Sequence, residues 1–135
     1  MERFVIEEYT EDTGIWSLYQ SVGWSSLYPP ETLKHAFDAS LCILVAYHRE
    51  APVGLIRAVG DGITVVLIQD VLVHPRYQRK GIGTRLIAKL WQKFPGVSQQ
   101  YVLTDDRAET VGFYRAVGFL PIEQLHQKAL AKMRI

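Results

Sequence analysis

The hydrophobic and polar residues at the start of the chain are spaced as in a short strand followed by two helices. Residues 4–8 predict the strand, and apolar residues at helical spacing predict the helices. Gly23 suits the end of the first helix, and Pro29 with Pro30 suits the first turn of the second, so residues 24–28 are expected to form a loop. The residues expected to cap the first helix are Thr10, Asp12 and Thr13.

The middle of the chain changes to runs of β-forming residues. Residues 41–47, 53–59 and 63–73 are joined by short turns, the second of them Gly60-Asp61-Gly62, which predicts an antiparallel meander. Helical spacing returns after Pro75 and lasts until Pro95-Gly96. Residues 101–104 then predict one more strand.

The last part of the chain predicts a short helix and two closing strands. Asp106, followed by Glu109, resembles a capping box, and Gly118 would close the helix that it starts. Residues 119–123 and 129–135 have the pattern of closing strands. Together the elements predict an α+β fold, a single domain over residues 1–135, with a mixed, mostly antiparallel sheet of about seven strands and four helices.

Length and charge limit the classes of function. The chain has 135 residues and a formal net charge of +1, so it lacks the excess of Lys and Arg that nucleic-acid binding requires. Its apolar runs are far shorter than the roughly 20 residues needed to cross a bilayer, and no membrane association is expected. The single cysteine, Cys42, and an acidic start without a secretory pattern predict a cytoplasmic protein.

The segment from Gln78 to Thr84 is the most informative for chemistry. It lies where a predicted strand leads into a helix, and Gly81 and Gly83 permit a tight turn with several backbone N–H groups at the helix start. Those amides and the positive end of the helix form an anion site suited to a diphosphate. The glycine spacing matches neither the P-loop nor the dinucleotide-binding pattern. The basic residues around this turn are Arg79, Lys80 and Arg85.

Two longer strings resemble a known family. Gln78-Arg79-Lys80-Gly81-Ile82-Gly83 resembles the acyl-CoA-binding signature of the GNAT N-acyltransferase superfamily, and residues 113–119, Phe-Tyr-Arg-Ala-Val-Gly-Phe, are similar to its second element. The resemblance implies the GNAT fold, acetyl-CoA as acyl donor, and a CoA diphosphate held by Gln78 and the amides of residues 79–84. It further implies that the preceding strand contacts pantetheine through Val71, Leu72 and Val73, where an N–H of Leu72 or Val73 would polarise the thioester carbonyl.

Amine attack on a thioester needs an acid and a base. Tyr114 is the candidate acid, because a phenol can protonate the departing thiolate; the alternative is an aromatic side chain packed on a short helix. Asp70 is the first candidate base, because it is a charged residue inside an apolar run, and the alternative is a structural hydrogen-bond acceptor. His74 is the second candidate, with a turn-capping role preferred.

The positions around the predicted site also differ from the family pattern. Where many relatives have Asn and Ala, this chain has Arg107 and Thr110. Asp106 would take over a pantetheine contact with a shift of one residue, and the alternative is a helix N-cap.

The predicted loop carries aromatic residues that are candidates for acceptor binding. Trp24 and Tyr28 would line a site for an aryl or hydrophobic amine, and the alternative is hydrophobic anchoring of the loop. The string Val22-Gly23-Trp24 and the later Gly60-Asp61 are similar to plant-type serotonin N-acetyltransferases.

The sequence therefore predicts an acetyl-CoA-dependent N-acetyltransferase that acts on a primary amine of a small molecule by direct attack on the thioester. Two alternatives stay open: a non-catalytic acyl-CoA-binding regulator, and a transferase for protein N-termini or lysines. The family resemblance allows a homodimer. Cys42 is expected to pack as a small apolar residue. His35, His48 and His126 lack metal-ligand spacing, so no metal is expected.

Overall fold

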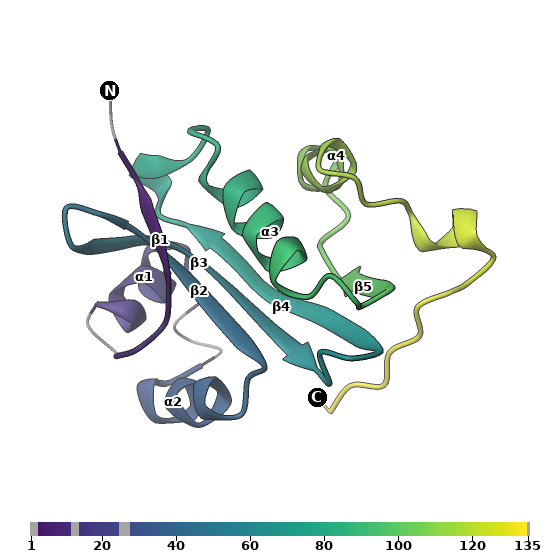
Figure 1. The fold of residues 1–135 in the computed structure, drawn as a ribbon, viewed down its shortest axis with the longest axis horizontal. Coiled ribbons are helices and arrows are strands. Elements are labelled where there is room, and N and C mark those ends of the chain that lie inside the picture. Colours follow the sequence, from purple (N-terminus) through teal and green to yellow (C-terminus); the bar gives the residue numbers. More distant parts are fainter. Residues whose placement is uncertain (1–2, 12–13, 25–27, 135) are drawn as a thin grey trace. The chain divides into compact units, whose positions relative to one another are not determined.

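The computed structural model describes residues 3–11, 14–24 and 28–134. The chain divides into two units, residues 1–103 and 104–135, and each is described by itself. The first unit holds a sheet with the strand order β1-β2-β3-β4-β5 (Figure 1). Its strands are β1 (Val5–Glu8), β2 (Cys42–His48), β3 (Ala51–Gly60), β4 (Val65–Val73) and β5 (Gln99–Val102). Its helices are α1 (Ile15–Ser21), α2 (Pro30–Asp38), α3 (Ile82–Lys93) and the 3₁₀ helix η1 (Pro75–Tyr77). The second unit contains α4 (Ala108–Ala116) and the 3₁₀ helix η2 (Ile122–Leu125).

The predicted meander is confirmed. β1 to β4 pair antiparallel in chain order, and β5 pairs parallel to β4. α1 and α2 cover one face of this sheet, and α3 covers the other (Figure 1). The α+β class with a mixed sheet and four α-helices therefore agrees with the described part of the chain.

The expected number of about seven strands is wrong. The sheet of the described residues has five strands, and the expected strands over 119–123 and 129–135 are absent from the described residues 119–134. Pro121 has no N–H for a ladder and instead leads into η2, which ends at His126 in the left-handed region with φ 58. The alternation after residue 129 buries no face, since Leu130 and Met133 are 92% and 76% exposed.

Helix ends follow the local sequence in most places. Gly23 adopts φ 80 just after α1, and Pro30 is the first residue of α2, both as predicted. α1 begins after Gly14, while Asp12 and Thr13 lie outside the described residues. The capping box at Asp106 is wrong, because Arg107 occupies the N-cap position of α4. Asp105 Oδ1 accepts the Arg107 N–H at 3.0 Å instead.

One core cluster lies between the sheet and the first two helices. Tyr19 of α1 and Phe37 of α2 pack there with ring centroids 6.0 Å apart. Buried residues of this cluster are Ile15, Leu18, Tyr19, Leu33, Phe37, Ile43, Val45, Leu55 and Leu72. Cys42 is a buried free thiol on β2, as expected. None of the helices in the described ranges is long and apolar enough to span a membrane.

The hairpin before β4 is closed by one aspartate. Asp61 Oδ1 accepts N–H groups from Ile63, Thr64 and Val65 at 2.9, 2.8 and 3.0 Å. Its Oδ2 accepts the Thr64 hydroxyl at 2.6 Å. The Thr64 hydroxyl first, and the backbone amides next, hold the pKa of Asp61 well below its usual range. The ionised carboxylate therefore stabilises the start of β4.

This arrangement predicts a pH-dependent effect of Asp61→Asn. Because the folded pKa lies below the unfolded value of about 4, the stabilisation is present above that pH and is lost as the pH falls below it. Asp61→Asn should lower the Tm at pH 7, and its difference from the unchanged protein should narrow below about pH 4. Thermal unfolding between pH 7 and pH 3 measures this, with the exposed Asp38→Asn as control. A Tm difference independent of pH would contradict the assignment.

Candidate functional site

β4 loses one of its two neighbours partway along its length. Its pairing with β5 covers Val65 to Ile68 and ends at the pair Ile68–Val102, whereas its pairing with β3 continues to Val73. Arg57 of β3 lies opposite Asp70 and the next residue, Ala58, lies opposite Ile68, so Gln69 is the extra residue of a β-bulge. Beyond this bulge, β4 has a ladder with β3 on one side and no paired strand from the described residues on the other, and this second side is called the open edge.

The register decides which backbone groups face the open edge. His74 N–H donates to Val53 O at 2.8 Å, and hydrogen-bonded pairs alternate along an antiparallel ladder. Leu72 therefore bonds to β3, while the N–H and C=O groups of Val71 and Val73 point away from it. Val73 O accepts from Gln78 Nε2 at 3.0 Å, which agrees with this direction.

This register changes which backbone N–H groups of β4 are expected to contact a ligand. The prediction that the Leu72 N–H faces a ligand is wrong, because its backbone belongs to the ladder with β3 and its side chain is buried in the core. Val73 stays a predicted donor toward a ligand at this edge, and Val71 takes the place of Leu72. Gln78, which the sequence placed in the ligand-binding turn, ties that turn back to β4.

The turn before α3 adopts the conformation that its glycine suggests. Arg79 and Gly81 have positive φ values of 63 and 82, and Gly81 is the N-cap of α3. The first helical bond runs from Arg85 N–H to Gly81 O at 3.0 Å, so the N–H groups of residues 82–84 precede the helical ladder. No acidic residue occupies the first turn. The helix start therefore offers amide donors and a positive dipole end to an anion.

The basic residues of the turn have different positions. Arg79 and Lys80 are exposed beside the N-cap. Arg85 donates from Nη2 to Phe4 O at 3.3 Å, so it holds the segment before β1. His74 Nδ1 accepts the Arg76 N–H at 3.1 Å, which is the turn-capping role preferred from the sequence.

Asp70 is a paired carboxylate, as in the structural alternative considered from the sequence. Its Oδ2 accepts from Arg57 Nε at 2.8 Å and from Tyr19 Oη at 2.9 Å, and the residue is only 5% exposed. Arg57 Nη1 also donates to Ser40 Oγ at 3.2 Å. These contacts favour the structural alternative over the role of general base.

The partners of Asp70 are held in matching protonation states. Burial, and then the negative charge of Asp70, raises the pKa of Tyr19, so its hydroxyl keeps the proton that it donates. Burial alone would lower the pKa of Arg57, but the hydrogen bond and attraction to Asp70 outweigh it and raise that pKa. The guanidinium therefore stays charged beside the carboxylate.

The predicted acceptor residues lie partly buried against the core. The Trp24 ring is 6.3 Å from that of Tyr19, with the planes at 56°. Tyr28 O accepts from Trp16 Nε1 at 3.4 Å. These contacts agree with the alternative that Trp24 and Tyr28 anchor the chain to the core. Residues 25–27, between them, are not among the described residues. The role of Trp24 and Tyr28 in acceptor binding stays a prediction.

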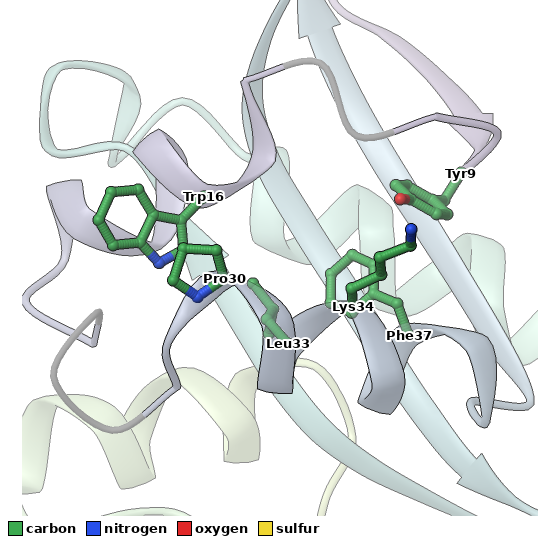
Figure 2. A pocket seen from close by; sticks show the side chains of 6 residues that line it. All are labelled: Tyr9, Trp16, Pro30, Leu33, Lys34 and Phe37. Atoms are coloured by element: carbon green, nitrogen blue, oxygen red, sulfur yellow. The ribbon is translucent and has the colours of Figure 1, made fainter.

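A small pocket that sequence reasoning missed lies between α1, α2 and the residue after β1 (Figure 2). In Figure 2 the Lys34 ammonium points toward Tyr9, whose ring packs edge-on against Phe37 with centroids 5.0 Å apart. Its walls are Tyr9, Trp16, Pro30, Leu33, Lys34 and Phe37. The pocket does not include either predicted acceptor residue.

In the second unit, Tyr114 lies half-buried on α4. Its ring packs against Phe113 and Phe119, with centroid separations of 5.0 and 5.6 Å. Burial, with a smaller contribution from the charge of Asp105, raises the pKa of Tyr114 to about 12. The phenol is therefore protonated at neutral pH. Asp106 is exposed just before the N-cap residue, and its predicted ligand contact stays a prediction.

Comparison with known proteins defines the class. The acetyltransferase (GNAT) domain model matches residues 39–121, and the chain belongs to the GNAT family. The resemblance inferred from the two strings is thereby confirmed. A solved structure of a GNAT-family acetyltransferase from Streptococcus pneumoniae is 34% identical, with a TM-score of 0.85 over 99% of this chain and 98% of that one.

Curated relatives are similar over part of their length. A ycf52-like N-acetyltransferase of Prochlorococcus marinus is 29% identical over 106 residues, which cover 76% of this chain and 58% of that protein. Serotonin N-acetyltransferase 2 of Oryza sativa, a chloroplastic protein, is 34% identical over 68 residues, covering 50% of this chain and 34% of that protein. The chain therefore spans between about a third and three fifths of these two relatives.

The paired state of Asp70 predicts a specific pattern of stability. Asp70→Asn leaves the buried Arg57 charge without its counterion and should lower the free energy of unfolding by about 3 kcal/mol. Replacing both residues, as Arg57→Met with Asp70→Leu, should recover much of that loss, because an apolar pair needs no charge compensation. Urea unfolding measures both variants, with the exposed Asp38→Asn as control. A double variant no more stable than Asp70→Asn would argue against the pairing.

Proposed function

We propose that this GNAT-family protein transfers the acetyl group of acetyl-CoA to a primary amine of a small molecule. The observation that carries the proposal is the open edge of β4 beside the anion-binding start of α3. Gly54 connects the two: it is opposite Val73 in the ladder, and a Cβ added to it would lie 2.8 Å from Ile82 Cγ2. An acyl donor with a diphosphate at one end and amides along its arm suits both features.

The residues of this chain fit such a donor by their chemistry. The amides of residues 82–84 and the charges of Arg79 and Lys80 would hold the diphosphate. The outward backbone groups of Val71 and Val73 would bind the amides of the pantetheine arm, as a strand edge binds an extended chain. When bound, acetyl-CoA supplies a thioester as the activated acetyl group.

The proposed reaction forms a bond between the amine nitrogen and the acetyl carbon and breaks the carbon–sulfur bond. An outward N–H of β4 would stabilise negative charge on the carbonyl oxygen. Tyr114 would give its proton to the thiolate, since burial keeps its phenol protonated at neutral pH. We assign the amine proton to solvent water, because Asp70 is occupied by Arg57 and Tyr19.

Charge and similarity support a small acceptor. A net charge of +1 provides no long-range attraction for a strongly basic protein tail. Trp24 and Tyr28 have aromatic surface suited to an aryl or hydrophobic amine. The similarity to a protein named serotonin N-acetyltransferase points in the same direction.

The direct test combines binding and turnover. The purified protein is mixed with acetyl-CoA and a panel of amines, and free thiol and the mass of the acetylated amine are followed. Amine-dependent thiol release supports the transferase. Tight CoA binding without such release would make the protein an acyl-CoA-binding regulator, and acetylation confined to peptide substrates would replace the small-molecule acceptor.

The role of Tyr114 predicts a loss of turnover without a loss of affinity. Tyr114→Phe removes the proton donor but keeps the ring that packs against Phe113 and Phe119. We expect kcat to fall about 100-fold, the usual scale for a general acid, while the Kd for CoA stays within about twofold. Steady-state kinetics and calorimetry measure the two effects. Tyr47→Phe on β2 is the matched control, and an unchanged kcat for Tyr114→Phe would remove it from the acid role.

A further inference from the structure

Gly54 on β3 faces the first turn of α3 at unusually short range. A Cβ built at this position would lie 2.8 Å from Ile82 Cγ2, 3.4 Å from Leu72 O and 3.5 Å from Leu86 Cδ1. Ordinary contacts between carbon atoms are about 3.5–4.0 Å. The space for a side chain is therefore closed on the helix side by Ile82.

The requirement for glycine here is steric. Gly81 needs glycine for its positive φ of 82, and a Cβ there would meet nothing within 4 Å. Gly54 is the opposite case: it lies on β3 without a positive φ, directly after the extra residue Val53 of the β2–β3 bulge, and its added Cβ would collide. A glycine inside a strand weakens the strand and often marks a bulge or a close approach of another segment. The 2.8 Å separation from Ile82 Cγ2 shows that a close approach is present at Gly54 in addition to the bulge.

Gly54 also lies beside both parts of the proposed donor site. Across the ladder it is opposite Val73, whose N–H points to the open edge of β4. On the face of the sheet it lies against Ile82, the first residue of α3. Ile82 also carries the first of the three N–H groups, those of residues 82–84, that precede the helical hydrogen bonds. The distance between the thioester end and the diphosphate end of the site therefore depends on the contact between Gly54 and Ile82.

We propose that Gly54 is a positioning residue for acyl-donor binding: its lack of a side chain sets the height of the α3 N-terminus above the open edge of β4. The inference rests on the proposed function, since it concerns the same site. Ile82 cannot yield easily, because it is buried, branched at Cβ, and flanked by Leu86. The clash of an added methyl group with Ile82 is relieved by a shift of the first turn of α3. That shift moves the amides of residues 82–84 away from the Val73 N–H.

The proposal predicts reduced donor binding in Gly54→Ala and its recovery in a compensating double variant. A misplacement of about 1 Å in a binding site has large effects on affinity, so we expect Gly54→Ala to raise the Kd for CoA at least tenfold. Ile82→Ala removes the Cγ2 atom that the new methyl group would meet. The double variant Gly54→Ala with Ile82→Ala should therefore bind CoA within about threefold of Ile82→Ala alone.

The experiment measures Kd for CoA by calorimetry, together with Tm and the KM values for acetyl-CoA and amine. Gly96→Ala is the matched control, because a Cβ at Gly96 meets nothing within 4 Å and no positive φ is required. Gly83→Glu, which places a negative charge in the first turn of α3, should abolish binding. A positioning role raises the Kd for CoA and the KM for acetyl-CoA in Gly54→Ala, with the amine KM unchanged.

The outcomes separate the two proposals. If the unchanged protein does not bind CoA, the proposed function fails and this inference fails with it. If the unchanged protein binds CoA and Gly54→Ala binds equally well, only the role of Gly54 is overturned. If Gly54→Ala cannot be purified, the double variant decides: binding close to that of Ile82→Ala supports the role, and much weaker binding overturns it.

Discussion

The buried ion pair between Arg57 and Asp70 stabilises the part of the sheet that carries the proposed donor site. It joins β3 to β4 at the bulge, directly after the last pair between β4 and β5. Tyr19 ties the same carboxylate to α1, and Ser40 ties the guanidinium to the segment before β2. A buried charge that loses its partner is strongly destabilising, so the pair permits little change in the register of β3 and β4. A slip of one residue would exchange the backbone groups that face the open edge.

The proposed donor site consists mostly of main-chain groups. β4 contributes outward N–H groups at Val71 and Val73, and α3 contributes the amides of its first turn. Backbone donors of this kind are rigid because the sheet and helix that carry them are rigid, which suits both binding and stabilisation of developing charge. Gly54, without a side chain, lets these two sets of donors lie next to each other.

Sequence reasoning succeeded where the chemistry is local. Gly81 and the turn before α3, Pro30 at the start of α2, and Gly23 after α1 each follow from the backbone preference of one residue type. It failed where a partner decides the outcome. The alternation after residue 129 resembles a strand, but the described residues there have no strand partner. The pairing of Asp70 does not follow from its own strand, because its partner lies on the neighbouring one, although Arg57, a charge in another apolar run, is a signal that could have revealed the pair.

Residue types and their spacing were enough to identify the family of this protein, its mixed order of helices and strands, and the glycine turn before α3. These depend on residue types at short separations, so they can be read from the chain. The tertiary structure alone decided that the outward donors are at Val71 and Val73, that Asp70 is occupied, and that Gly54 faces Ile82. The physical reason is that a bulge, an ion pair and a close contact each join residues from different elements. Their positions are set by packing across the sheet, which no local pattern contains.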